Sequence, residues 1–145
     1  MRLLIQRVRR ASVQINNETI ASIGRGLLVF VGVAQSDQAD TAQTLAEKVS
    51  YLRIFDDTEG EMNLDVTQIG GEVLVVSQFT LYADTSRGRR PGFEMAAKSD
   101  HAELVYRFFC QALRRLNLKV QEGRFQEQMI VSLENDGPAT FILER

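Results

Sequence analysis

The sequence predicts an α+β domain in which a curved, mostly antiparallel sheet, or a partial β-barrel, packs against two main helices. Short apolar runs separated by turn residues predict the strands of this sheet. Two longer segments carry apolar residues at helical spacing. A chain of 145 residues can bury a core without disulfides, so residues 1–145 are expected to form a single domain.

The first third of the chain predicts an antiparallel meander. Four runs of apolar and β-branched residues are separated by polar or glycine-containing turns, such as Asn16-Asn17-Glu18. The predicted strands cover residues 3–8, 11–15, 19–23 and 27–33.

A helix is predicted after this meander. Asp37 and Asp40 are both candidate N-caps for a helix that continues to about Leu52. One apolar stripe recurs at helical spacing along the segment, formed by Ala42, Leu45, Ala46, Val49 and Leu52.

A second helix is predicted from Asp100 to about Leu116. Asp100 and Glu103 have the spacing of a capping box at its start. His101 falls off the apolar face of this helix, so it is expected to point to solvent rather than to act as a general base. That face is predicted to consist of Ala102, Val105, Tyr106, Phe109, Leu113 and Leu116.

The remaining predicted strands are short. Residues 82–98 predict a long irregular segment rich in arginine and glycine, and loops of that length are usually either functional or disordered. The strands are predicted at residues 53–55, 73–76, 119–121, 128–133 and 140–143, and residues 134–139 are expected to connect the last two.

The stretch from Val73 to Leu81 is the centre of the prediction. Val73-Leu74-Val75-Val76 is an unbroken apolar run, which is typical of a strand buried on both faces. The run ends in Ser77-Gln78-Phe79-Thr80, so a rigid strand would deliver polar groups to a site. The alternative is a strand end or β-bulge whose hydroxyls are satisfied locally.

Composition excludes several classes of site. Cys110 is the only cysteine, so neither a disulfide framework nor a cysteine-based zinc site is possible, and a reducing cytoplasm is the expected location. No apolar segment is long enough to span a membrane, and a net charge of −2 does not indicate a long nucleic-acid duplex as partner. Two basic groups could hold a few phosphates, although such groups are more often solvated surface: Arg7, Arg9 and Arg10, and Arg87, Arg89, Arg90 and Lys98.

Few catalytic mechanisms fit these residues. His101 is the only histidine and no motif surrounds it, so a Ser-His-Asp or Cys-His constellation is not indicated. The sequence contains no metal-ligand cluster and no glycine-rich phosphate loop, so neither a metal nor a cofactor is expected. An enzyme built from this chain would have to act on a labile substrate, by positioning it and by using backbone donors.

Two segments could supply such positioning. The main-chain N–H groups of Phe79 and Thr80 could bind a developing oxyanion, and losing one such donor typically costs about 10²–10³ in rate. Gly137-Pro138 is either an ordinary turn with a trans bond or a rigid main-chain wall, since proline fixes φ and glycine permits close approach.

These same segments carry a resemblance to a known family. Ser77-Gln78-Phe79-Thr80-Leu81 together with Asn135-Asp136-Gly137-Pro138-Ala139-Thr140 resembles the two signature motifs of the D-aminoacyl-tRNA deacylases, also called D-tyrosyl-tRNA deacylases. Gly92 departs from the serine of many relatives, which affects only loop detail. The similarity covers essentially the whole chain and includes Gln6-Arg7-Val8, Gly26-Leu27-Leu28-Val29 and Arg90-Pro91.

The resemblance implies a cytoplasmic homodimer, with active sites at the subunit interface, that hydrolyses the ester between a D-amino acid and the 3′ end of tRNA. Gly137-Pro138 would be a cis pair inserted into the partner's site, where its carbonyls bind the amino group and exclude an L side chain. Arg7 would brace this motif, and Ala102 would lie near the terminal adenosine. The segment Ser77-Gln78-Phe79-Thr80 would be catalytic, and its last two residues would form the oxyanion hole.

Two accounts of catalysis exist for this family, with either the Thr80 hydroxyl as nucleophile or the substrate's own 2′-hydroxyl as activating group. The sequence favours the second, because no base for Thr80 is visible and a hydroxyl nucleophile is weak without one. A site that only blocks L side chains has nothing to block in glycine, so glycyl-tRNA is also expected to be hydrolysed. The alternatives are a small RNA-binding β-barrel without catalysis, which would use the arginine loop and Phe93, and a generic esterase for small activated esters.

Overall fold

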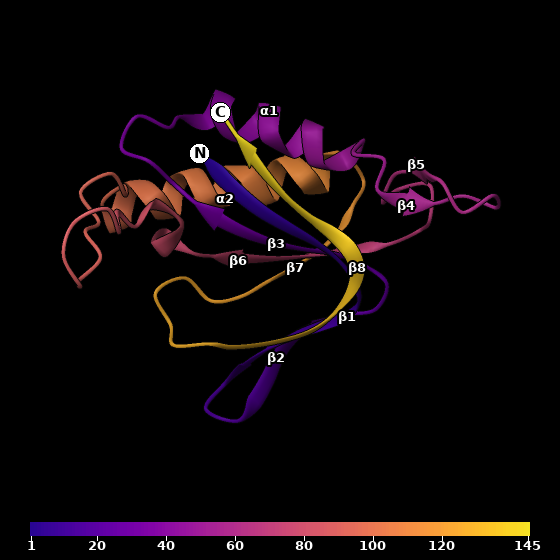
Figure 1. Cartoon of the computed structure of the whole chain (residues 1–145), viewed down its shortest axis with the longest axis horizontal. Coiled ribbons are helices and arrows are strands. Elements are labelled where there is room, and N and C mark those ends of the chain that lie inside the picture. Colours follow the sequence, from indigo (N-terminus) through magenta and orange to yellow (C-terminus); the bar gives the residue numbers. More distant parts are fainter.

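A six-stranded sheet forms the centre of the computed structural model, which describes residues 1–145 (Figure 1). The strand order is β2-β1-β3-β6-β7, and β8 pairs with β1 outside this path. The strands β4 and β5 form a separate two-stranded sheet. In chain order the elements are β1 (Arg2–Ile15), β2 (Glu18–Ile23), β3 (Gly26–Gly32), α1 (Ala39–Ser50), β4 (Phe55–Asp56), β5 (Met62–Leu64), β6 (Glu72–Ser77), the 3₁₀ turn η1 (Phe79–Tyr82), α2 (Ser99–Arg115), β7 (Lys119–Glu122) and β8 (Ile130–Glu144).

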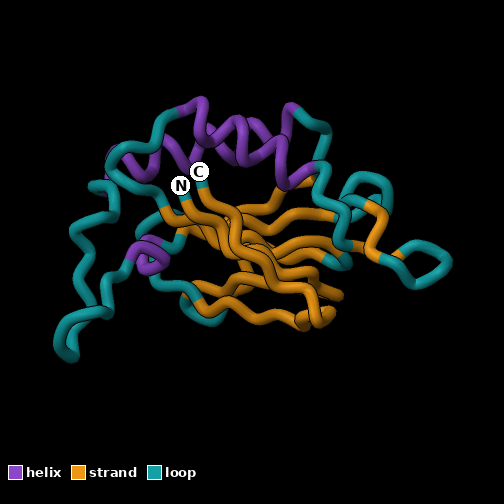
Figure 2. The backbone as a smooth tube through the Cα atoms, turned by 45° about the horizontal axis from the view of Figure 1, so that its top comes forward, coloured by secondary structure: helices purple, strands orange, loops and turns teal.

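The predicted α+β class with a mostly antiparallel, curved sheet is confirmed. Four of the six strand pairs are antiparallel, and the parallel pairs are β3–β6 and β6–β7. The helices α1 and α2 connect these parallel strands and cover the same face of the sheet, as parallel crossovers require (Figures 1 and 2). The central strand β6 is therefore paired on both edges, and Val73 to Val76 are buried as predicted.

The strand boundaries were predicted wrongly in two places. The predicted strands 3–8 and 11–15 are one continuous strand, β1, and the predicted strands 128–133 and 140–143 are joined in β8. Both long strands keep pairing with each other through two register shifts, which absorb the polar residues between the apolar runs. A β-bulge within one strand and a loop between two strands look alike in a sequence, because both interrupt the alternation of apolar and polar residues.

The bend in β1 and β8 divides the apolar residues into two clusters. The larger cluster lies between the sheet and the helices, where Leu3 and Ile5 of β1 pack with residues such as Val49 and Phe109. The smaller cluster lies inside the curled end of the sheet and consists of Val8, Ala11, Val13, Ala21, Ile23, Leu28, Leu74 and Val76. The curled end makes the sheet barrel-like.

The start of α1 differs from the prediction that Asp37 or Asp40 caps it. The N-cap residue is Gln38, whose N–H is paired with Thr41. Asp37 is only 4% exposed, and its carboxylate binds the amino group of Met1 at 2.6 Å and accepts the Ala34 N–H at 2.6 Å. A buried carboxylate requires such partners. Asp37 was predicted to cap the helix, but it forms an ion pair in the core instead.

The start of α2 also lacks the predicted capping box. The helix begins at Ser99 after Lys98, and Glu103 binds Arg107 one turn further along. His101 is partly buried rather than solvent-facing, because its Nε2 lies 2.7 Å from the carbonyl oxygen of Asp37. The predicted buried face is present, with Cys110 and Ala112 added to it and Leu116 only partly buried. Neither helix is both long and apolar enough to cross a membrane.

Gly26 of β3 pairs with Glu72 of β6, and its replacement is expected to destabilise the sheet. A Cβ at this position would be 1.9 Å from the main-chain oxygen of Glu72. We expect Gly26→Ala to lower the free energy of unfolding by about 3 kcal/mol, the upper end of the usual cost of overpacking. Denaturant unfolding measures this change. Gly24→Ala is the matched control, since its Cβ would meet only a Glu72 carboxylate oxygen at 3.8 Å, and equal midpoints for the two variants would contradict the expectation.

Candidate active site

Two main-chain N–H groups just after β6, those of Phe79 and Thr80, donate no hydrogen bond within the turn that they begin. The Gln78 N–H donates to Val31 O at 2.7 Å and fixes the exit of the strand. The first hydrogen bond of η1 runs from the Leu81 N–H to Gln78 O at 3.2 Å, so the N–H groups of Phe79 and Thr80 precede it, as at any helix start. Both residues are exposed, Phe79 to 55%. The two N–H groups are therefore available to a ligand.

The Thr80 hydroxyl has no base beside it. Its oxygen is paired with the Gln78 side-chain amide, which cannot remove a proton. The one histidine, His101, is engaged with the Asp37 carbonyl instead. A threonine without a base is a weak nucleophile, so this segment is suited to binding an oxyanion rather than to forming a covalent intermediate.

Arg7 connects β1 to the bulge in β8. Its side chain is 4% exposed, and its Nε donates to Asp136 O at 2.9 Å while Nη1 donates to Ile54 O at 2.7 Å. It also forms ion pairs with the carboxylates of Asp56 at 3.0 Å and Asp136 at 3.3 Å. Arg7 is thus a buried cross-link that holds the chain directly before Gly137.

The Gly137-Pro138 bond is cis, and the pair lies in the middle of a wide bulge in β8. Gln6 pairs with Thr140 and Val8 with Asn135, so four residues of β8 stand opposite Arg7 alone. Gly137 and Pro138 are exposed, whereas the next residue, Ala139, is fully buried and anchors the bulge. The Asn135 side chain adds a second link, since its Nδ2 donates to Arg7 O at 3.1 Å.

The structure places the two predicted site segments at opposite ends of the sheet. Ser77 pairs with Val31, which pairs with Leu3, whereas the bulge stands at the level of Arg7. Four residues along a strand correspond to about 13 Å, and two strand spacings separate β1 from β6 in addition. Residues 137–138 and 79–80 of one chain therefore do not form one site by themselves.

Ala102 lies in the first turn of α2, as the sequence indicated. It is 8% exposed and belongs to the main core, and its N–H donates to Lys98 O at 2.8 Å. Sequence reasoning assigned no role to Asn135, Asp136 or Asp56, which hold Arg7. The only signal for the first two was their position directly before Gly137-Pro138.

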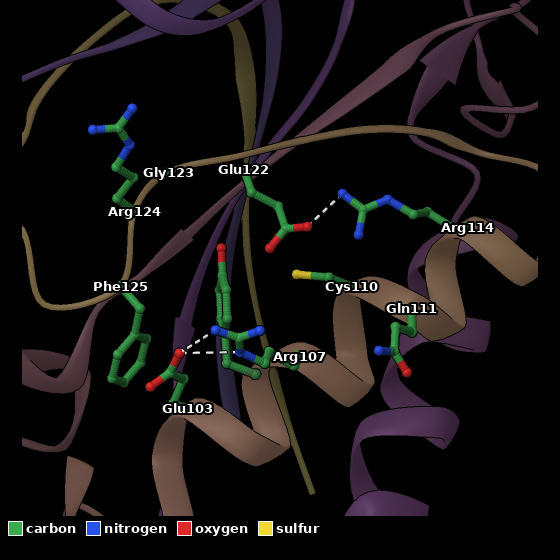
Figure 3. Close-up of a pocket in the computed structure, with 10 residues that line it drawn as sticks. Glu103, Arg107, Cys110, Gln111, Arg114, Glu122, Gly123, Arg124 and Phe125 are labelled. Carbon is green, nitrogen blue, oxygen red and sulfur yellow. Dashed lines mark hydrogen bonds and ion pairs between the residues drawn. The ribbon is translucent and has the colours of Figure 1, made fainter. Parts of the chain in front are cut away.

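A cleft of about 390 Å³ runs along α2 and contains none of the predicted site residues (Figure 3). Two ion pairs, Arg107–Glu103 and Arg114–Glu122, lie along it. Burial raises the pKa of the Cys110 thiol well above its usual range, so the thiol stays protonated near neutral pH. The cleft therefore offers no activated nucleophile.

Comparison with known proteins relates the whole chain to one family. The family described as D-Tyr-tRNA(Tyr) deacylase matches residues 4–144. The chain belongs to this family. The D-aminoacyl-tRNA deacylase of Symbiobacterium thermophilum is 50% identical over 144 residues, 99% of this chain and 95% of the relative. That of an Enterobacter species is 53% identical over 141 residues, 97% of each chain.

Two solved structures share the fold of this chain. A protein described as c-Myc DNA Unwinding Element Binding Protein has a TM-score of 0.93 and 36% identity, and the match covers 100% of this chain and 99% of that chain. A probable eukaryotic D-amino acid tRNA deacylase has a TM-score of 0.86 at 16% identity, which shows the shared fold. The predicted resemblance is confirmed, and with it the prediction of an enzyme of the hydrolase class.

Proposed function

We propose that this chain hydrolyses the ester bond of D-aminoacyl-tRNA and releases the free D-amino acid and tRNA. The names of relatives that are about half identical over the full chain support the reaction. The observation that carries the mechanism is the pair of unpartnered N–H groups at Phe79 and Thr80, at the end of a strand that has a neighbour on each edge. The cytoplasm remains the expected location.

The reaction needs little from side chains. Water adds to the ester carbonyl carbon, the N–H groups of Phe79 and Thr80 stabilise the resulting oxyanion, and the terminal ribose 3′-oxygen leaves with a proton. The neighbouring 2′-hydroxyl of the substrate assists this step, since no side-chain base stands near Thr80. Ser77 and Gln78 belong to the same segment and hold it against β3.

The proposed chiral selection depends on an immobile main chain. A compliant pocket distinguishes one misplaced methylene by only about 1–3 kcal/mol, so strong rejection of L substrates requires a stiff wall. The bulge at Gly137-Pro138 has the support that such a wall needs. Arg7 holds the Asp136 carbonyl on one side of the pair, and the buried residue Ala139 anchors the other side. The Gly137 and Pro138 carbonyls would bind the substrate's amino group.

A homodimer would complete this site. The two segments lie at opposite ends of the sheet in one chain, and a closed two-fold pair can bring the bulge of each protomer to the N–H groups of the other. The active sites would then lie at the subunit interface, with Ala102 close to the terminal adenosine.

Replacing the Thr80 hydroxyl is expected to leave most activity. Thr80→Ala keeps the backbone N–H, so we expect kcat on D-tyrosyl-tRNA to stay within about tenfold of the wild type, much less than the loss of an oxyanion donor. Single-turnover deacylation measures this. A folded Thr80→Ala variant without turnover would assign the nucleophile to the hydroxyl.

Glycyl-tRNA is expected to be a substrate. Glycine has no side chain for the Gly137-Pro138 wall to exclude, so steric selection alone cannot reject it. We expect measurable release of glycine from glycyl-tRNA at enzyme concentrations where L-tyrosyl-tRNA is stable. Complete resistance of glycyl-tRNA under these conditions would mean that selection is not purely steric.

The function is tested by incubation with D-tyrosyl-tRNA and L-tyrosyl-tRNA, with and without a chelator. D-selective release that the chelator does not affect is the expected result. Binding of both RNAs without release would instead indicate the RNA-binding barrel. Equal turnover of a small aminoacyl nucleoside and of aminoacyl-tRNA would indicate a generic esterase.

A further inference from the structure

Residues 84–92 form an arginine hairpin whose positive charges are unpaired. Asp84 and Gly92 close it with two backbone hydrogen bonds of 2.8 and 2.9 Å, and Gly88 at the tip has φ +67°. The three arginines of the tip are exposed and take part in no ion pair or side-chain hydrogen bond within the chain: Arg87, Arg89 and Arg90.

The arginine hairpin is attached to the candidate oxyanion site. The ring of Phe93, directly after the hairpin, lies 5.0 Å from the ring of Phe79. Gln35 holds the following segment by donating from Nε2 to Glu94 O at 2.6 Å. Figure 2 shows the resulting loop extending beyond η1 at one end of the sheet. The hairpin therefore has a defined position beside the Phe79 and Thr80 N–H groups.

The charge of the hairpin is not neutralised by its own acidic residue. The Asp84 carboxylate accepts the Ser86 N–H at 2.9 Å, which holds its oxygen in the turn. Elsewhere on the surface, arginines such as Arg2, Arg10 and Arg107 are ion-paired with glutamates. Three arginines within four residues of one hairpin, none of them ion-paired, form a binding surface for closely spaced anions, and guanidinium groups match phosphate geometry.

We propose that the arginine hairpin binds the phosphates of the tRNA strand next to the scissile ester. This inference rests on the proposed function and adds a phosphate-binding segment to the same site. The phosphates do not change when the ester is cleaved, so these contacts stabilise the ground state and the transition state equally. They should therefore lower KM without raising kcat.

The test is a triple variant, Arg87→Gln with Arg89→Gln and Arg90→Gln, assayed on D-tyrosyl-tRNA and on D-tyrosyl-adenosine. Each phosphate contact on a single strand contributes about 0.7 to the slope of log affinity against log salt, so three contacts contribute about 2. Between 50 and 200 mM salt, wild-type KM for the tRNA should therefore rise about 15-fold more than the variant's. We expect kcat to be unchanged, and kcat/KM on D-tyrosyl-adenosine to be equal for both proteins.

The matched control removes the same charge from the opposite end of β6, around Glu72, with Arg25→Gln, Arg115→Gln and Lys119→Gln, all exposed. An unchanged salt slope in the hairpin variant, or an equal change in the control, overturns the proposal. Equal losses on D-tyrosyl-adenosine would assign the hairpin a structural role and overturn it as well. Arg89→Gln alone, expected to lower the slope by about 0.7, serves if the triple variant does not fold. Wild-type protein inactive on both D substrates would instead refute the proposed function.

Discussion

Phe79→Pro is expected to lower kcat on D-tyrosyl-tRNA by about 10²–10³ relative to Phe79→Ala, the usual cost of losing one oxyanion donor. Proline removes the N–H, and alanine keeps it, whereas both remove the aromatic ring. Phe79 is the first residue of η1, and Gln78 before it has φ −145° and ψ 79°. Proline is tolerated at the first position of a helical turn and after a residue outside the α region. The pair of variants therefore isolates one hydrogen-bond donor.

The measurement is single-turnover deacylation with saturating enzyme, so that weaker substrate binding does not lower the observed rate. Phe79→Ala itself also loses the 5.0 Å ring contact with Phe93, which is why it is the reference rather than the wild type. Near-equal rates for the two variants would show that the Phe79 N–H does not meet the reacting oxygen. The oxyanion hole would then have to be sought elsewhere.

The sequence was sufficient to predict the central strand β6 and the point where it ends, because both depend on local residue patterns. The run from Val73 to Val76 is typical of a strand buried on both faces, and the structure places it between two parallel neighbours. The sequence also predicted that this run ends in the polar segment Ser77-Gln78-Phe79-Thr80, and the strand does end at Ser77, although the 3₁₀ turn that follows was not foreseen. What exposes the Phe79 N–H is the position of the first hydrogen bond of that turn, which no side-chain pattern encodes.

The parts that sequence reasoning missed depend on contacts between distant segments. Asp37 has the local pattern of a helix cap, but the amino group of Met1 is a stronger partner for a buried carboxylate. The bulge at residues 136–139 resembles a loop between two strands, and only the pairing of β8 with β1 on both sides of it reveals one strand. Arg7 belongs to a basic cluster that would ordinarily be solvated, yet it is buried because two carbonyl and two carboxylate groups converge on it.

That convergence on Arg7 makes it the residue whose replacement should most alter chiral selection. Arg7→Lys keeps the charge, but a single ammonium cannot reproduce a fork that donates to Asp136 O and Ile54 O from different nitrogens. The carbonyl before Gly137 would then be free to move. We expect the D-over-L ratio of kcat/KM to fall to about 10–200-fold, the discrimination of a compliant pocket.

The ratio is measured with D-tyrosyl-tRNA and L-tyrosyl-tRNA, and the rise in the L rate is the informative part, since a merely damaged enzyme would lose both rates together. Arg10→Lys is the control, because Arg10 is an exposed residue of the same strand that pairs with Glu134. Arg7→Ala should lower the free energy of unfolding by about 3 kcal/mol, since it leaves buried acceptors without a donor. A folded Arg7→Lys enzyme with the wild-type D-over-L ratio would show that the wall is rigid without Arg7, and the bulge anchored at Ala139 would then have to supply that rigidity alone.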